Sequence, residues 1–421
     1  MEVQQSRGSA VSVSESNLFV QYLKKDKVFK DKRFLMPVFV PSKIPHRENE
    51  IRQLSNILSP TIRGYKPNNI FIYGNVGTGK TICTKFVLAQ LNEIAHCSKR
   101  RIKTLYVNCK MKKIADTEYR LLAQILNELG DTVPDTGLPT DVLYRRFFDK
   151  LDQLKAIVIL VLDEIDHLFR KTGDDFLYNL TRVNTDLKES SIAIIGITND
   201  LSFRDGLDTR VKSSLGEEEI IFRPYDALQL KDILLERARQ GFYENTIGER
   251  TVCFCAALAA QEHGDARRAL DLLRIAGEIA ERNGESTVTE EHVTIAEEKL
   301  DTDRVTESVS CQPKQSQALL YSVIKLIKRR RNGTQNKWSD SRLLTGDVVA
   351  MYKTICEESG MKSLTQRRVS DLIGELDVMG IVTTQVISRG RYGRTREISL
   401  AMNDNLTQRV ENLLSERFNH I

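Results

Sequence analysis

The segment Gly-Asn-Val-Gly-Thr-Gly-Lys-Thr has the residue types and spacing of a phosphate-binding loop. It follows a short apolar run and precedes a helical pattern, so backbone N–H groups and a helix N-terminus would face a phosphate chain. Lys80 would reach the β- and γ-phosphates, and Thr81 would offer its hydroxyl to Mg²⁺. The loop therefore predicts binding of ATP or ADP with Mg²⁺ through Gly74, Asn75, Val76, Gly77, Thr78, Gly79, Lys80 and Thr81.

Two carboxylates follow a second apolar run, and an amide follows a third. Asp163 would hold Mg²⁺ and Glu164 would act as general base on the attacking water. Taken alone, two acids after a strand are equally typical of a helix cap, but the phosphate-binding loop favours the catalytic interpretation. Asn199 would orient that water or contact the γ-phosphate, although Asn-Asp is also a common turn pair.

The elements that must position these residues alternate between strands and helices. Short β-branched or aromatic runs separated by amphipathic stretches predict an α/β fold, a parallel sheet flanked by helices. After this region only helical patterns remain, until a basic C-terminal part with further helices and two β runs. The predicted strands lie at 70–73, 104–107, 157–162 and 192–197.

Composition shifts predict five parts of the chain. A Ser- and Gln-rich N-terminus is expected to be disordered, and a polar stretch before the basic domain is expected to be a linker. The expected order is a tail at 1–17, a nucleotide-binding base at 18–225, a helical domain at 226–300, a linker at 301–315 and a DNA-binding domain at 316–421.

Charge and hydropathy indicate which classes of partner the protein can have. The 421 residues carry a net charge of +5, and residues 315–421 contain 17 Lys and Arg against 11 Asp and Glu. A basic C-terminal domain favours a nucleic acid partner, although a solubilising surface explains the charge equally well. No apolar run is long enough for a membrane span, so we expect a cytoplasmic, nucleoid-associated protein with no membrane partner.

The C-terminal part contains a pattern typical of a winged helix. The helical stretch 363–379 has one apolar stripe, and polar residues cluster at its N-terminal end, where a recognition helix contacts bases. A basic, Gly-containing loop between two β runs predicts a wing, although a solvated turn is the alternative. The predicted DNA contacts are Gln366, Arg367 and Arg368 in the helix and Arg389, Arg391, Tyr392, Arg394 and Arg396 in the wing.

These motifs together resemble the AAA+ ATPases, and more narrowly the archaeal replication initiators of the origin-recognition and cell-division-cycle type. The resemblance extends from about Val38 to the C-terminus. Besides the loop and the acidic pair, it rests on His46-Arg-Glu-Asn-Glu-Ile51, Gly196-Ile-Thr-Asn-Asp-Leu201, Leu207-Asp-Thr-Arg-Val-Lys-Ser-Ser-Leu215 and Gly264-Asp-Ala-Arg-Arg-Ala-Leu-Asp-Leu-Leu-Arg274.

The resemblance implies residue roles that spacing alone does not. Asn199 would be the first sensor, and Arg267 the second sensor, reaching the γ-phosphate from a helical lid. Arg210 would be an arginine finger for a neighbouring subunit, although Thr209 stands where the family often has Pro. Arg47 would lie over the base, and Tyr225 would join the same pocket. The family also places a DNA-contacting helical insertion at about 111–131, where the residues alone indicate an ordinary amphipathic helix.

The resulting hypothesis is an ATP-dependent initiator that binds duplex DNA at replication origins, with slow, switch-like ATP hydrolysis. The resemblance also implies recruitment of the replicative helicase and another initiator subunit on DNA. The alternatives are an AAA+-like signalling ATPase that regulates transcription through a winged helix, a clamp-loader-like subunit, and a DNA-binding protein with a purely structural nucleotide.

Overall fold

The computed structural model describes residues 28–110, 117–134, 137–173, 175–203, 206–215, 217–333, 343–388 and 394–418. The chain divides into two compact units, Met1–Thr294 and Ile295–Ile421. The expected tail at 1–17 lies outside the described residues, as do Arg389, Arg391 and Tyr392 at the expected tip of the wing.

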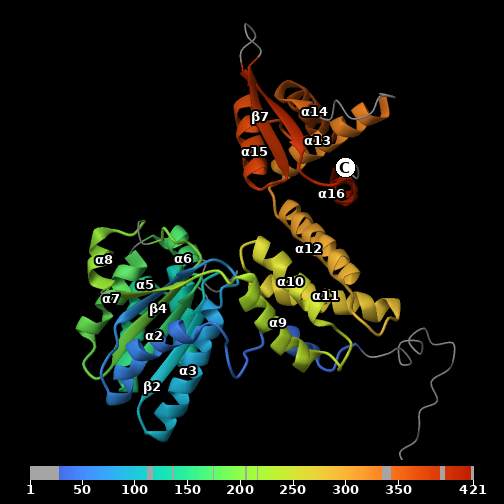
Figure 1. The fold of residues 1–421 in the computed structure, drawn as a ribbon. Helices are drawn as coiled ribbons and strands as arrows, with labels where there is room; N and C mark the ends of the chain where they lie inside the picture. Colours follow the sequence, from blue (N-terminus) through green and yellow to red (C-terminus); the bar gives the residue numbers. More distant parts are fainter. Residues whose placement is uncertain are drawn as a thin grey trace, which may run out of the picture. The chain divides into compact units, whose positions relative to one another are not determined.

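A parallel sheet forms the centre of the first unit (Figure 1). Its strand order is β2-β3-β4-β1-β5, which confirms the predicted α/β fold. The interior strand β3 is buried throughout because both faces of the sheet are covered, and this explains its unbroken apolar sequence. The strands are β1 (Asn69–Gly74), β2 (Ile102–Asn108), β3 (Ile157–Asp163), β4 (Ser191–Thr198) and β5 (Glu217–Phe222).

Helices cover the two faces of this sheet and form two cores. Consecutive residues of β1 point to opposite faces, so Phe71 joins one core while Ile70 and Ile72 join the other. The core with Ile70 includes residues of α2 (Glu48–Leu58) and α3 (Lys80–Cys97). The core with Phe71 draws on α4 (Glu118–Glu128), α5 (Thr140–Leu154), α6 (Ile165–Thr172), α7 (Asp175–Asp186) and α8 (Thr209–Leu215). The short helix η2 (Ser59–Arg63) follows α2.

An all-helical lid completes the first unit, as predicted. Its helices are α9 (Ala227–Gly241), α10 (Glu249–Gln261), α11 (Ala266–Asn283) and the start of α12 (Glu290–Ser310). Asp226 and Gln229 form a capping box at the start of α9, which fixes where the lid begins.

The first described residues of the chain pack on this lid, whereas we expected them in the base. The Phe29 ring lies 4.8 Å from the ring of Phe242. Leu35, in the short helix η1 (Lys32–Leu35), is fully buried against Gly241. This contact requires a glycine at position 241, because a Cβ there would lie only 2.9 Å from Leu35 Cγ. The chain thus passes from the lid to the base between Leu35 and α2.

The second unit is a winged helix, as predicted. Its sheet has the order β6-β8-β7, and its core draws on every helix of the unit. The elements are α13 (Lys314–Gly333), β6 (Leu343–Leu344), α14 (Thr345–Glu358), α15 (Gln366–Val378), β7 (Val382–Ser388), β8 (Arg394–Leu400) and α16 (Asp404–Phe418).

The stretch expected as a linker, 301–315, is mostly helix and requires a correction. Helix α12 continues to Ser310, and α13 begins at Lys314. Polar composition suggested a loop, but no Gly or Pro interrupts the stretch before Pro313. Val305 and Val309 are four residues apart on one helical face, and both contact the core of the second unit.

No helix in the described part of the chain is long and apolar enough to cross a membrane.

Candidate nucleotide and DNA sites

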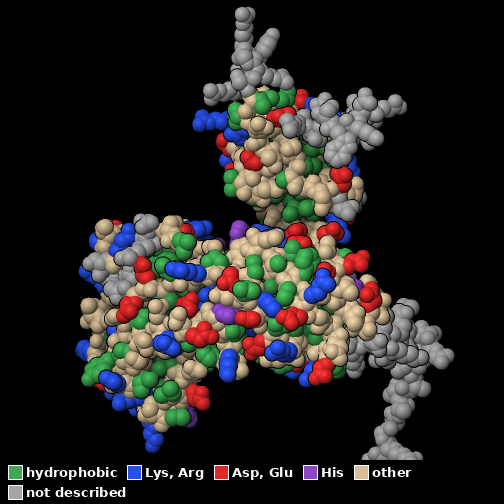
Figure 2. All heavy atoms as spheres, viewed as in Figure 1, with side chains coloured by type: hydrophobic (Ala, Val, Ile, Leu, Met, Phe, Trp, Pro, Cys, Tyr) green, Lys and Arg blue, Asp and Glu red, His purple; other side chains and the backbone are tan. Residues whose placement is uncertain are grey.

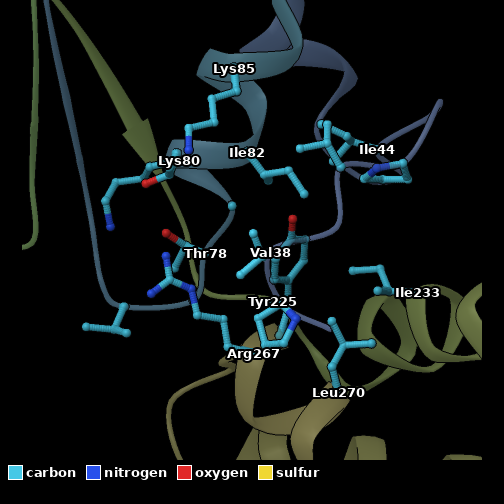
Figure 3. A pocket seen from close by; sticks show the side chains of 18 of the residues that line it. Val38, Ile44, Thr78, Lys80, Ile82, Lys85, Tyr225, Ile233, Arg267 and Leu270 are labelled. Carbon is cyan, nitrogen blue, oxygen red and sulfur yellow. The ribbon is translucent and has the colours of Figure 1, made fainter. Parts of the chain in front are cut away.

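A cavity of about 450 Å³ lies at the carboxyl ends of the strands and beneath the lid. Its lining includes the phosphate-binding loop, the ends of β2 and β3, and residues of α9 and α11 (Figure 3). An apolar wall comes from residues 37–45 on one side and from Ile233 and Leu270 of the lid on the other. The volume and the mixed polar and apolar lining suit a nucleotide.

The phosphate-binding loop is in direct contact with the lid. Gly77 has φ +73°, and a Cβ there would lie 1.6 Å from Asp265 Oδ1, so only glycine fits. The backbone N–H of Ala266 donates to the Gly77 carbonyl at 3.2 Å. Asp265 in turn caps α11 by accepting from the N–H groups of Arg267 and Arg268. The start of α11 is therefore fixed against the loop.

Lys80 lies inside the pocket and is held by three oxygens. Its ammonium donates to the carbonyls of Gly74 and Asn75, both at 2.7 Å, and to Asn199 Oδ1 at 2.8 Å. Burial lowers the pKa of Lys80 to about 8; the negative charge of Asp163 opposes this shift, and the positive charge of Arg267 adds to it. The structure thus brings Lys80 and Asn199 together.

The predicted Mg²⁺ ligands are adjacent. Thr81 Oγ1 donates to Asp163 Oδ2 at 2.8 Å, and the hydroxyl of Tyr106 donates to the same oxygen. No group of three or more His, Cys, Asp or Glu side chains within the described ranges could hold a metal by itself. A hydroxyl and one carboxylate beside a phosphate loop fit Mg²⁺, which usually keeps several waters and binds substrate phosphates.

Glu164 lines the same pocket in an unusual backbone conformation. Its φ of +56° is in the left-handed region, which is rare for a residue with a side chain. Its Oε2 is buried without a hydrogen-bond donor, and the nearest cation is Lys110, whose Nζ lies 3.8 Å away. Such strain is found mostly at functional sites. Because Glu164 lines the pocket and one of its oxygens accepts no hydrogen bond, its carboxylate can accept a proton from water.

The expected second sensor, Arg267, lies in the pocket, whereas the expected arginine finger, Arg210, does not. Arg267 lines the pocket and extends from α11 towards the phosphate-binding loop (Figure 3). Arg210 is exposed on α8, where it pairs with Asp208 at 3.3 Å, and it does not line this pocket. Its action on a neighbouring subunit stays a prediction.

Arg47 does not line the pocket, which corrects the expectation that it lies over the base. It is 3% exposed, and its guanidinium packs 3.9 Å from the centroid of the Tyr225 ring. It donates to the carbonyls of Thr78 and Arg223 and pairs with Glu50. Arg47 therefore supports the loop from behind. Tyr225 does line the pocket, and burial raises its pKa to about 12.

Several lining residues had no signal in the sequence. Ile233, Glu236, Arg237 and Leu270 come from lid helices, where their apolar or charged character looks like ordinary amphipathic packing. Tyr106 was hidden in an apolar strand. An aromatic residue within a strand next to the acidic pair is the signal that could have found it.

The winged helix exposes part of its predicted DNA surface. Gln366, Arg367 and Arg368 are exposed in the first turn of α15. Arg368 is partly engaged, since it pairs with Glu375 at 3.3 Å. Of the wing residues, Arg394 lies at the start of β8.

Arg396 requires a correction. Its guanidinium donates to the Ser370 carbonyl of α15 at 3.0 Å and lies beside Gly374, so it joins the wing to the recognition helix. It is half-buried and does not extend from the wing as a free DNA contact.

Helix α13 and the expected insertion at 111–131 also carry Lys and Arg side chains, which could contact DNA phosphates. In α13, Lys325, Lys328 and Arg330 pair with Glu358, Glu411 and Asp347, which favours a solvated, ion-paired helix. In the expected insertion, residues 111–116 lie outside the described residues. The rest of it contains α4, whose leucines are buried in the core of the base.

Family models match all three domains of the chain. A AAA domain matches residues 63–204, a Cdc6 AAA+ ATPase-type lid domain matches 231–298, and the CDC6 C-terminal winged helix domain matches 307–410.

Relatives match over nearly the whole length. An ORC1-type DNA replication protein of Thermococcus kodakarensis is 49% identical over 389 residues, covering 91% of each chain. An ORC1-type DNA replication protein 1 of Methanosarcina mazei is 46% identical over 94% of this chain and 93% of its own. The solved structure of Aeropyrum pernix ORC1 in complex with DNA is 44% identical, with a TM-score of 0.80, over 94% of this chain and 99% of that one.

Proposed function

Since the chain belongs to the family of ORC1-type DNA replication proteins, we propose that it is an ATP-dependent initiator that binds duplex DNA at replication origins. The observation that carries the proposal is the exposed first turn of α15, which presents Gln366, Arg367 and Arg368 on a winged helix. A relative 44% identical to this chain has been solved in complex with DNA. We place the protein in the cytoplasm, associated with the nucleoid.

The nucleotide site supports slow ATP hydrolysis used as a switch. Lys80 and the loop amides would bind the phosphates, and Thr81 with Asp163 would hold Mg²⁺, which would supply positive charge to neutralise the phosphates. Glu164 would take a proton from the attacking water, and Asn199 would orient that water. Arg267 would contact the γ-phosphate from the lid, and Arg210 would act on a neighbouring subunit's nucleotide.

The loop–lid contact is where nucleotide state would be sensed. Arg267 follows Asp265 and Ala266, which meet Gly77 directly. A γ-phosphate gained or lost beside Arg267 therefore changes the charge at the point where α11 touches the loop. Proposed partners are origin DNA, a further initiator subunit and the replicative helicase; the last two are supported by family membership alone.

Binding to fragments of the organism's own genome tests the proposed recognition of origin DNA. At a fixed salt of about 150 mM, we expect the tightest fragments to lie near a replication start and to exceed a scrambled duplex by about a thousandfold. Arg367→Ala with Arg368→Ala should reduce this ratio, whereas Arg250→Ala, an exposed cation of the lid, should not. Equal affinity for all duplexes would exclude sequence-specific origin recognition.

Turnover by a Glu164→Gln variant tests the catalytic arm. We expect ATP binding to persist and hydrolysis to fall by about a hundredfold or more, because the variant keeps the shape of the side chain but loses the base. Glu93→Gln, on the exposed face of α3, is the control. Unchanged turnover in Glu164→Gln would show that Glu164 is not the base.

A further inference from the structure

Two loops at the amino-terminal edge of the sheet carry an unusual concentration of positive charge. One of these regions, residues 59–68, contains η2 and the loop before β1. The other, residues 96–104, contains the end of α3, the loop 98–101 and the first three residues of β2. Together they contain six Lys and Arg residues and no Asp or Glu. By contrast, residues 1–314 as a whole carry 45 Lys and Arg against 46 Asp and Glu. The excess is therefore local.

We name five of these cations the edge patch: Arg63, Lys66, Lys99, Arg100 and Arg101. The two loops approach each other, since a Cβ on Gly64 would lie 3.7 Å from the guanidinium of Arg100. All five side chains are exposed, and Lys and Arg side chains are visible at the end of the base where α3 ends and β2 begins (Figure 2). The sixth cation, Lys103, belongs to β2 and interacts with Glu128, since its positive charge opposes the rise in the pKa of that carboxyl that burial causes.

The edge patch has no counter-charge of its own within the part of the chain that the structure describes. None of its five side chains forms an ion pair there. Other cations of the same unit do, including the exposed Lys155 with Glu189 and the partly buried Lys32 with Glu281 and Lys231 with Glu249. The C-terminal ends of η2 and α3 offset part of the mutual repulsion. The remaining excess creates a positive potential suited to an anionic partner.

We propose that the edge patch binds the phosphate backbone of DNA, as a contact separate from the winged helix. The Lys and Arg side chains are spread over two loops along the edge of the sheet. This arrangement suits a row of phosphates, as in a DNA backbone, better than a single small anion. Tyr65, 69% exposed between Arg63 and Lys66, adds a ring on which an unpaired base can stack. The proposal rests on the proposed DNA binding and extends it to a second surface.

The edge patch is also remote from the nucleotide. The strands are parallel, so the loops that precede β1 and β2 lie at the opposite edge of the sheet from Gly74 and Asp163. A strand of six or seven residues spans about 20 Å. Changes to the edge patch should therefore leave ATP binding intact, which separates its test from that of the nucleotide site.

The test uses the full-length protein and a non-specific duplex of about 40 base pairs. The variant carries Arg63→Gln, Lys66→Gln, Arg100→Gln and Arg101→Gln. The control removes the same charge from the lid surface by Lys32→Gln, Lys231→Gln, Arg239→Gln and Arg250→Gln. The readout is the slope of log Kobs against log salt, to which each phosphate contact contributes about 0.9.

We expect the edge-patch variant to reduce the slope by about 2 or more and the control by less than about 0.5. Thermal unfolding and ATP affinity should match the wild type in both. A Tyr65→Ser variant separates the two forms of DNA, since only single-strand affinity should fall if bases stack there. If wild-type protein binds DNA and the edge-patch variant keeps the full slope, the proposal is overturned. If wild-type protein binds no DNA, the proposed function itself fails.

Discussion

Lys80 holds a positive charge in a pocket that disfavours it. Burial lowers its pKa to about 8, so much of the population is neutral just above that pH. Phosphate oxygens favour the charged form, so ATP binding raises the pKa and takes up a proton above pH 8. We expect ATP affinity to fall as pH rises from about 8 to 9, by up to about tenfold per unit. Titration calorimetry in buffers of different ionisation enthalpy measures the proton uptake.

Lys80→Arg is the control for that pH dependence, because arginine stays charged throughout the range. The variant should bind ATP with a flatter pH profile and without the proton uptake. Equal proton uptake in the variant and the wild type would assign the effect to another group.

Tyr106 shares an acceptor with the expected Mg²⁺ ligands, since its hydroxyl and that of Thr81 both donate to Asp163 Oδ2. It should therefore orient this carboxylate. Removing the hydroxyl by Tyr106→Phe should raise the Mg²⁺ concentration needed to enhance ATP binding by about tenfold to a hundredfold, because a hydrogen bond to a charged group contributes about 1.5–3 kcal/mol. ADP affinity without Mg²⁺ should not change. Fluorescent-nucleotide titrations at several Mg²⁺ concentrations measure both, and an unchanged Mg²⁺ requirement would contradict this role.

At the scale of elements, Arg237 of α9 connects the lid to the chain that walls the pocket. It is 6% exposed and donates to the carbonyls of Phe34 and Phe39 at 3.4 and 3.2 Å. Arg237→Ala should release residues 37–45, weakening ATP binding by about tenfold and unfolding stability by about 1–3 kcal/mol. Arg239→Ala, exposed on the same helix, should change neither. Nucleotide affinity and denaturant unfolding provide the two measurements.

The wing and the recognition helix form a second pair of coupled elements. Arg396 donates to Ser370 of α15, and Asp377 of α15 accepts from the N–H and hydroxyl of Thr384 in β7. Arg396→Gln should weaken DNA binding without changing its salt slope, because this side chain positions the helix. Arg367→Gln should instead lower the ratio of specific to non-specific affinity, as expected for a contact to base edges. A fall in slope for Arg396→Gln would instead make it a direct contact.

Some secondary-structure elements could be predicted from the sequence and others could not. Strand β3 and the loop before α3 were predictable because burial on both faces and phosphate geometry each demand a distinct sequence pattern. Strand β5 was missed because it starts with Glu217, Glu218 and Glu219, which an edge strand tolerates. The packing of Phe29 and Leu35 on the lid was also missed, because contacts between segments far apart in the chain produce no periodic pattern in the local sequence.

At the scale of the whole molecule, the sequence predicted some functional side chains correctly and others wrongly. Residues held by one loop, such as Lys80 and Thr81, were predictable from spacing. Arg47 and Arg396 were assigned to ligands because the sequence shows a charged side chain but not its partner. In the fold both find backbone carbonyls, which no residue type encodes. Charge alone therefore located functional regions and did not identify every functional side chain.

The boundary of the winged-helix unit gives the last prediction. Its core includes Val309, which is fully buried, and the partly buried Val305 packs against it. The Gln317 side-chain amide also donates to the carbonyls of Val309 and Ser310. A fragment 295–421 should unfold cooperatively, whereas a fragment 316–421, cut at the boundary expected from composition, should be less stable by about 2–4 kcal/mol, the value of burying two valine side chains. Urea unfolding followed by circular dichroism compares the two. Equal free energies of unfolding would show that the end of α12 adds nothing to this core, and would restore 301–315 as a linker in energetic terms despite its helical structure.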